Sequence, residues 1–397
     1  MPWKETCSME ERIRFILSAL EEEHSFSWLC SHYGISRETG YKWLRRYELL
    51  GLEGLKERSR APLDHGLARS SDLVSAVLGL RERYPFFGPR KLRVKLGELL
   101  PSVDLPAAST IGDWLRKRGL TQSRRRRQRC TPSSQPFAEV KRPNDVWAVD
   151  FKGWFRTGDG RRCDPLTVSD GFSRYLLRCQ AVDHPDYVHV RPVFEKAFRE
   201  FGLPHAIRSD NGPPFASLAA GGLSALAVWW IKLGIDCQRI EPGKPQQNGR
   251  HERMHRTLKA ETASPPSANG KEQQRRFNRF CQVFNHERPH EALGQRTPAS
   301  LYRPSARSYP RIVREPDYAD GVAVRRVRST GQIKWGGQLI FVSQVLVGEP
   351  VGIEETDNGE WRVRFADVTL GFIDKKGTRM CRNPLPRPKQ PTPTPVP

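Results

Sequence analysis

The sequence predicts a multidomain α/β protein, with an alternating α/β core between helical modules and a small all-β region. Its 397 residues exceed the size of one ordinary domain. Apolar residues recur at helical spacing through most of residues 1–122, and short β-type runs then alternate with helical segments from residue 143. Residues 307–375 contain short alternating strands that are separated by glycine-rich turns. This order of elements gives the fold class.

Residues 1–60 are expected to form a first helix-turn-helix module. Met9–Glu22 has helical spacing, Gly34 separates two short helices, and Ser36 is a suitable N-cap for the second of them. Gly40 should weaken that helix by about 1 kcal/mol relative to alanine. A plain three-helix bundle with a solvated basic face is the alternative. The candidate DNA contacts are Arg37, Lys42, Arg45 and Arg46.

Residues 66–122 are expected to form a second module of the same kind. Helices are predicted over Asp72–Arg83, over Pro89–Leu100 and over Thr110–Arg118, where Ser109 would be the N-cap of the last helix. The basic residues at the end of that helix would face phosphates. These residues are Arg116, Lys117 and Arg118.

The charge balance points to a polyanionic partner. Lysine and arginine number 66 against 44 acidic residues, which gives a net charge of +22. In the basic linker at 123–142, a run of arginines is either a solvated tether or a segment that follows the DNA backbone. The run consists of Arg124, Arg125, Arg126 and Arg127.

The sequence also excludes several classes of protein. It has no apolar run of spanning length and no signal peptide, so we expect a cytoplasmic, DNA-associated bacterial protein without a membrane partner. Eight cysteines without any C-x-x-C pair indicate reduced thiols, and they argue against a disulfide framework or a zinc knuckle.

Three acidic residues stand out in the α/β region. Asp150 and Asp210 each follow a short apolar run that is typical of a strand, and Glu252 lies one turn into a predicted helix. Hard cations such as Mg²⁺ prefer carboxylate oxygens, and phosphodiester transfer is commonly assisted by two such ions. The three side chains are therefore candidate catalytic residues and metal ligands.

The sequence around these acids resembles DDE transposases of bacterial insertion sequences and the related retroviral integrases. The resemblance rests on W-x-x-D at 147–150, S-D-N-G-P-P-F at 209–215 and P-G-K-P-Q-Q-N-G-R-H-E-R-M-H-R-T-L-K at 242–259. It implies a ribonuclease-H-like core at 143–262, a helical extension at 263–306 and an SH3-like β-barrel at 307–375. The Pro-rich tail at 376–397 is expected to be disordered. The Asp210 to Glu252 spacing is longer than in many members, so we expect a longer loop and helix at 216–233.

The same resemblance implies a function. The protein would bind terminal inverted repeats, cleave the element ends and join their 3′-hydroxyls to target DNA, as a homo-oligomer on double-stranded DNA. Two Mg²⁺ or Mn²⁺ ions per site would be held by Asp150, which bridges both, and by Asp210 and Glu252. Arg256 and Lys259 share a helix face with Glu252 and could contact the phosphates.

Two alternatives stay open at the level of sequence. A catalytically inactive DNA-binding regulator would have the same modules. The pattern H-E-x-x-H at residues 251–255 is also typical of zinc proteases, in which two imidazoles on one helix face hold the metal. A dependence on Mg²⁺ or Mn²⁺ with inhibition by zinc would favour the DDE interpretation.

Overall fold

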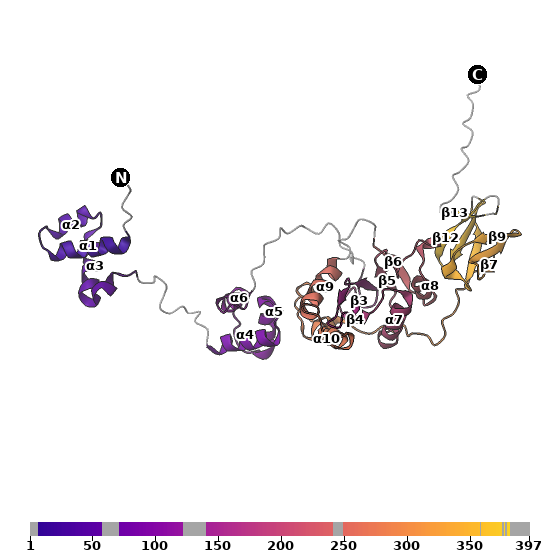
Figure 1. Cartoon of the computed structure of the whole chain (residues 1–397), viewed down its shortest axis with the longest axis horizontal. Helices are drawn as coiled ribbons and strands as arrows, with labels where there is room; N and C mark the ends of the chain where they lie inside the picture. The colour runs from indigo at the N-terminus through magenta and orange to yellow at the C-terminus, as the bar shows by residue number, and fades with distance from the viewer. Residues whose placement is uncertain are drawn as a thin grey trace, which may run out of the picture. The chain divides into compact units, whose positions relative to one another are not determined.

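The computed structural model describes residues 7–57, 71–121, 140–240, 249–357, 359–374, 377 and 379–381. These residues form two compact units, residues 1–70 and residues 71–397 (Figure 1). The arginine run at 124–127 and most of the predicted tail lie outside the described residues. Among the described helices, none combines the length and the apolar character needed to cross a membrane.

The first unit is a bundle of three helices. Ser36 caps its third helix as predicted, because its hydroxyl accepts a hydrogen bond from the Thr39 amide at 3.1 Å. Gly40 has a packing role, since a Cβ at this position would lie 2.7 Å from the Cys30 sulfur. The tight approach of neighbouring helices therefore explains a glycine that helix propensity alone disfavours. The elements are α1 (Ser8–Leu20), α2 (Phe26–His32), α3 (Arg37–Leu50) and η1 (Gly51–Leu55).

Three more helices begin the second unit. They pack around Val77, Leu92, Leu96 and Ile111, all of which are completely buried. The prediction that Ser109 caps the third helix is wrong: the helix begins at Ala108, so Ser109 lies in its first turn. The helices are α4 (Ser71–Arg83), α5 (Pro89–Leu99) and α6 (Ala108–Lys117).

A central mixed sheet follows. In the order β4-β3-β1-β5-β6, the pairs β4-β3 and β3-β1 are antiparallel, whereas β1-β5 and β5-β6 are parallel. The short strand β2 also pairs with β3. This is the antiparallel start and parallel continuation that the sequence predicts. The strands are β1 (Val146–Phe151), β2 (Phe155–Arg156), β3 (Arg162–Asp170), β4 (Leu176–Val182), β5 (Ala206–Ser209) and β6 (Asp236–Arg239).

Helices cover both faces of this sheet (Figure 1). Trp147 and Val149 of β1 pack against the apolar side chains of α7 and α8. Successive strand residues point to opposite faces, so Asp150 belongs to the face that α9 and α10 cover. The layers thus place this carboxylate beneath α9. The helices are α7 (Tyr187–Phe201), η2 (Ala220–Gly222), α8 (Ala225–Lys232), α9 (Gly249–Thr262) and α10 (Gly270–Gln282).

After α10 the chain makes a π-helical turn and then enters a C-terminal sheet. Its strands form an antiparallel sheet in the order β13-β12-β11-β10-β7, with a separate β8-β9 hairpin. The described strands leave this sheet open, so the predicted β-barrel is not confirmed. The elements are η4 (Val283–Glu287), η5 (Glu291–Leu293), α11 (Pro298–Leu301), β7 (Ala323–Arg326), β8 (Gln332–Trp335), β9 (Gln338–Phe341), η6 (Gln344–Leu346), β10 (Pro350–Glu355), β11 (Trp361–Phe365), β12 (Val368–Ile373) and β13 (Met380–Cys381).

Candidate active site

The parallel pair β1-β5 brings two of the predicted acids together. Ala148 of β1 is paired with Arg208 of β5. Continuing this register by two residues places Asp210, which directly follows β5, beside Asp150. Both carboxylates therefore lie at the carboxyl ends of adjacent strands, where open α/β sheets commonly bind ligands.

The surroundings of Asp210 fit a cation. Burial raises the pKa of its carboxyl group, and a hydrogen bond from the Gly212 amide at 3.3 Å opposes this shift. No charged side chain among the described residues contributes to this shift, and a divalent cation would supply a counter-charge to the partly desolvated carboxylate. The donor set is also suitable, because Mg²⁺ and Mn²⁺ prefer carboxylate oxygens.

Glu252 is positioned differently from the two aspartates. It lies in the first turn of α9 and is exposed to solvent. Arg256 and Lys259 are exposed as well, in agreement with their spacing along one helix face. The structure therefore brings the two aspartates together without Glu252. Among the described residues, no group of three or more acidic, histidine or cysteine side chains is arranged to hold a metal ion.

The adjacent, buried face of α9 carries two histidines, His251 and His255. His255 Nε2 lies 2.7 Å from the Thr167 hydroxyl, which donates a hydrogen bond to the Asp150 carbonyl at 3.0 Å. His255 Nδ1 is 3.9 Å from the Asp150 carboxylate. His251 Nε2 lies 3.3 Å from the Ser169 hydroxyl. The two imidazoles thus connect α9 to β3, next to the strand that carries Asp150.

Burial keeps both imidazoles neutral. Desolvation lowers the pKa of His251 to about 4. Desolvation, His251 and the Lys152 ammonium together lower the pKa of His255 to about 2. These rings are occupied by hydroxyl partners inside the protein, so the geometry does not favour a zinc-protease site. The buried position of these histidines could have been predicted from the sequence, because His251 and His255 share the i, i+3, i+4, i+7 spacing of one helix face with the apolar residues Met254 and Leu258.

The predicted DNA contacts of the two helical modules differ in availability. Arg37, Lys42 and Arg45 are exposed on α3. Arg46 is instead used inside its module: its guanidinium donates to the Lys56 carbonyl at 3.0 Å and lies 4.7 Å from the centre of the Trp43 ring.

The basic end of α6 is exposed throughout. Arg116 pairs with Asp113 at 2.7 Å, and Arg118 donates to the Trp114 carbonyl at 3.4 Å. Lys117 is exposed beside them. Ion pairs at this level of exposure are weak, so these side chains remain accessible to an anionic partner.

Comparisons with known families agree with this architecture. Two family models described as Integrase core domain match residues 140–245 and 233–298. A Helix-turn-helix domain model matches residues 11–62, and a Homeodomain-like domain model matches residues 39–115. The chain therefore carries an integrase core domain that is preceded by helix-turn-helix domains.

Similar proteins come from insertion elements and retroviruses. The insertion element IS476 uncharacterized 39.2 kDa protein of Xanthomonas euvesicatoria is 29% identical over 231 residues, which are 58% of this chain and 64% of that protein. The insertion element IS407 uncharacterized 31.7 kDa protein of Burkholderia multivorans is 32% identical over 189 residues, or 47% of this chain and 65% of that protein. The chain thus spans just under two thirds of these relatives. The Gag-Pol polyprotein of baboon endogenous virus is 32% identical over 118 residues, which are 30% of this chain and 6% of the polyprotein.

Solved structures of viral integrases are similar at low identity. One is the HTLV-2 integrase catalytic core domain in complex with magnesium, at 16% identity and a TM-score of 0.30, covering 41% of this chain and 98% of that chain. The sequence matches identify an integrase core domain in this chain, which is similar to insertion-element proteins and to retroviral Pol polyproteins. The resemblance identified in the sequence is therefore confirmed.

Proposed function

We propose that this protein is a DNA transposase that cleaves the ends of its insertion sequence and joins them to target DNA. The observation that supports the proposal is the β1-β5 register, which pairs Ala148 with Arg208 and, continued by two residues, would bring Asp150 beside Asp210 at the ends of adjacent parallel strands. The integrase core domain supports polynucleotidyl transfer as the reaction class. The helix-turn-helix domains support DNA as the substrate.

The reaction has two steps. Hydrolysis of a phosphodiester at the element end leaves a 3′-hydroxyl, and this hydroxyl then attacks a phosphodiester of the target. Asp150, Asp210 and Glu252 would hold the divalent cations, two per site. When bound, the cations would activate the attacking oxygen and stabilise the leaving oxygen.

The remaining residues have binding and positioning roles in this proposal. Arg256 and Lys259, exposed on α9, would hold the phosphates of the DNA near the acids. The exposed basic residues of α3 and α6 would bind the terminal inverted repeats. A homo-oligomer would hold the two ends of the element together. The helix-turn-helix modules would bind the end sequences, and the core domain would cut and join the DNA.

An end-joining assay tests the proposal. Purified protein is mixed with duplexes from the DNA that flanks its gene, a plasmid target, and Mg²⁺ or Mn²⁺. We expect the wild type to join 3′ ends covalently. Glu252→Gln should reduce joining by roughly 100-fold or more, on the order of what the loss of one transition-state-stabilising group costs.

Glu272→Gln is the matched control, because Glu272 is an exposed glutamate in the first turn of the neighbouring helix α10. This variant should join ends at the wild-type rate. Tight binding of the flanking DNA without cutting or joining under either metal would overturn the transposase proposal. A DNA-binding regulator would then be the better description.

A further inference from the structure

We propose that a pocket between Trp154 and α9 receives one unpaired nucleobase from the end of the DNA substrate. This inference deepens the proposed function and rests on it. The pocket has a volume of about 200 Å³. Its lining comes from the segment after β1, from β3 and from helices α9 and α10, and consists of Lys152, Gly153, Trp154, Phe155, Pro165, Leu258, Lys259, Thr262, Ala263 and Phe277.

The pocket adjoins the candidate active site along the chain and in space. Lys152 follows Asp150 by two residues, and its amide donates to the Pro165 carbonyl at 3.0 Å. Lys259 and Leu258 of the lining lie on α9, the helix of His255, whose ring is 3.9 Å from the Asp150 carboxylate. A nucleotide in this pocket would therefore be a close neighbour of the phosphodiester that is cut.

The lining combines an apolar base with a cationic rim. The side chains of Leu258 and Phe277 are 1% and 0% exposed, so they form the buried apolar base of the pocket. Lys152 and Lys259 are the charged residues of the lining, which contains no carboxylate. Such a site attracts a ligand that has an apolar face and a negative charge, and a nucleotide has both.

Trp154 supplies a stacking surface. Its side chain is 55% exposed, although an indole ring of this size is usually mostly buried. The guanidinium carbons of Arg156 and Arg162 lie 5.8 and 5.3 Å from the centre of the ring. Arg162 is ion-paired with Asp164 at 2.6 Å, so Arg156 is the cation that can hold the phosphate of a nucleotide whose base lies on the indole.

Size and energy both favour a single base. The pocket is smaller than the roughly 300–1,000 Å³ of sites for drug-sized ligands, which suits one planar ring system. Stacking of a base on an aromatic side chain contributes about 1–3 kcal/mol. Removing a base from a duplex costs a few kcal/mol, and the cost is lowest where pairing is already weak. Capture is therefore most favourable at a duplex terminus.

The test is a binding cycle between protein and DNA variants, measured without divalent metal so that no DNA is cut. Full-length wild type and Trp154→Ala are titrated with flanking duplexes in which one terminal nucleotide at a time is abasic. On intact ends, Trp154→Ala should weaken binding by about 5- to 150-fold, the range that corresponds to the stacking energy. At one abasic position, the two proteins should bind equally well.

Two further variants separate stacking from folding or general contact. Trp154→Phe should restore most of the binding, because phenylalanine keeps an aromatic face. Phe341→Ala removes a ring that is also 55% exposed, but on the C-terminal sheet. Unlike Trp154→Ala, this variant should show no difference from the wild type that disappears at one abasic position. An equal loss for Trp154→Ala at every abasic position, or no loss on intact ends, would overturn the pocket proposal.

The same cycle distinguishes the pocket from the proposed function. If the wild type joins ends while no abasic position removes the effect of Trp154, the pocket assignment fails and the transposase proposal stands. If one position removes the effect in the metal-free cycle while no joining occurs with Mg²⁺ or Mn²⁺, base capture stands and the transposase proposal fails.

Discussion

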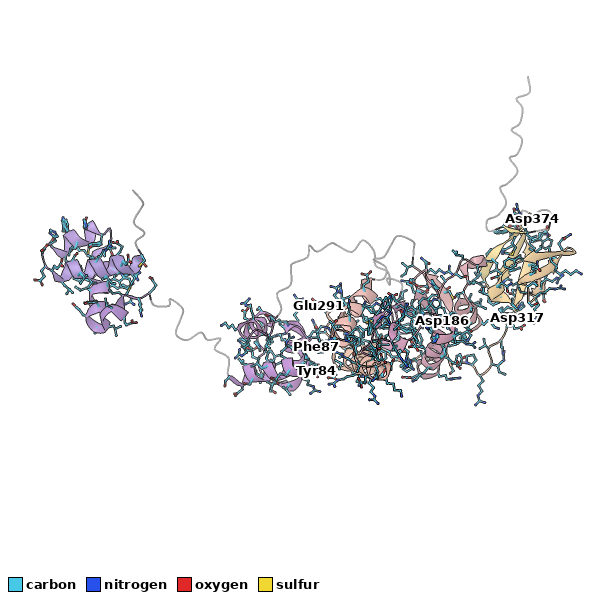
Figure 2. The ribbon with its side chains drawn as sticks, viewed as in Figure 1. Tyr84, Phe87, Asp186, Glu291, Asp317 and Asp374 are labelled. Atoms are coloured by element: carbon cyan, nitrogen blue, oxygen red, sulfur yellow. The ribbon has the colours of Figure 1, made fainter. Side chains whose placement is uncertain are left out.

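The integrase core domain makes two contacts inside the second unit, and they differ in chemistry. We call the contact between α4–α6 and residues 283–291 the helical contact, and that between α8 and the C-terminal sheet the sheet contact. In the helical contact, the Tyr84 hydroxyl donates to the Glu287 carboxylate at 2.6 Å, and Arg90 pairs with Glu291. Figure 2 labels Tyr84, Phe87 and Glu291. The Arg90–Glu291 pair is exposed and contributes little stability, whereas the Tyr84–Glu287 hydrogen bond is partly buried.

The sheet contact is apolar instead. Leu223, Ala227 and Val228, from α8 and the segment before it, belong to the same hydrophobic cluster as the inward-facing residues of the C-terminal strands. The ion pair of Lys232 and Glu349, at 2.6 Å, lies at the same contact with both side chains more than four-fifths buried. Burial of this extent fixes two parts of a chain together. The C-terminal sheet therefore shares a hydrophobic core with the integrase core domain, whereas the α4–α6 helices contact that domain through polar pairs at Glu287 and Glu291.

The largest expected effect is on the sheet contact. Leu223→Ala should lower the free energy of unfolding by about 2–5 kcal/mol, because it leaves a cavity at a side chain that is 2% exposed. Leu218→Ala is the matched control, since Leu218 lies five residues earlier and is 90% exposed. Urea unfolding of both variants measures the difference. Equal stabilities would mean that the shared core does not stabilise the protein.

A smaller effect is expected for the ion pair at the same contact. Lys232→Met should cost about 1.5–3 kcal/mol, because it leaves the partly buried Glu349 carboxylate without its charged hydrogen-bond partner. Adding Glu349→Gln should recover most of this loss, since the double variant has no unpaired charge. A double-mutant cycle on urea unfolding checks both statements, and additive losses would contradict a direct interaction.

A third effect concerns the helical contact and its dependence on pH. Desolvation, and then the Arg288 guanidinium, lower the pKa of Lys91 to about 7, while Glu261 and Glu291 oppose this shift. A lysine free in solution titrates near 10.4, so docking releases a proton between the two values. The helical contact should therefore tighten as pH rises from about 7 to about 10, and lose this part of its stabilisation as pH falls back through that window.

Competitive acylation of the full chain tests this prediction, because only the neutral amine reacts. In the wild type, Lys91 should react with an apparent pKa near 7. Reversing both acidic partners, with Glu287→Arg and Glu291→Arg, should open the contact and return the pKa of Lys91 toward that of an ordinary lysine. An unchanged titration in this double variant would mean that the low pKa arises within α4–α6 alone.

Sequence reasoning was accurate where local chemistry decides. The apolar run before Asp150 predicted β1, and Ser36 predicted the start of α3. The helix predicted over Asp72–Arg83 is α4, which begins one residue earlier. The prediction of a barrel at 307–375 is not confirmed, because closure depends on which sheet edges meet and the strand pattern of the sequence does not specify those edges. The sequence predicted a loop and helix at 216–233, and α8 lies there, but the sequence did not predict that this helix packs against the C-terminal sheet.

The candidate site divides in the same way. The sequence by itself determined the two strand-end aspartates and the helix that carries Glu252, because alternation, capping and motif spacing are local properties. Only the tertiary structure decided that His255, on the buried side of that helix, lies beside Asp150, and that Trp154 and Lys259 line one pocket. These neighbours are far apart in sequence, and the faces on which they meet are set by the packing of α9 and α10 on the sheet.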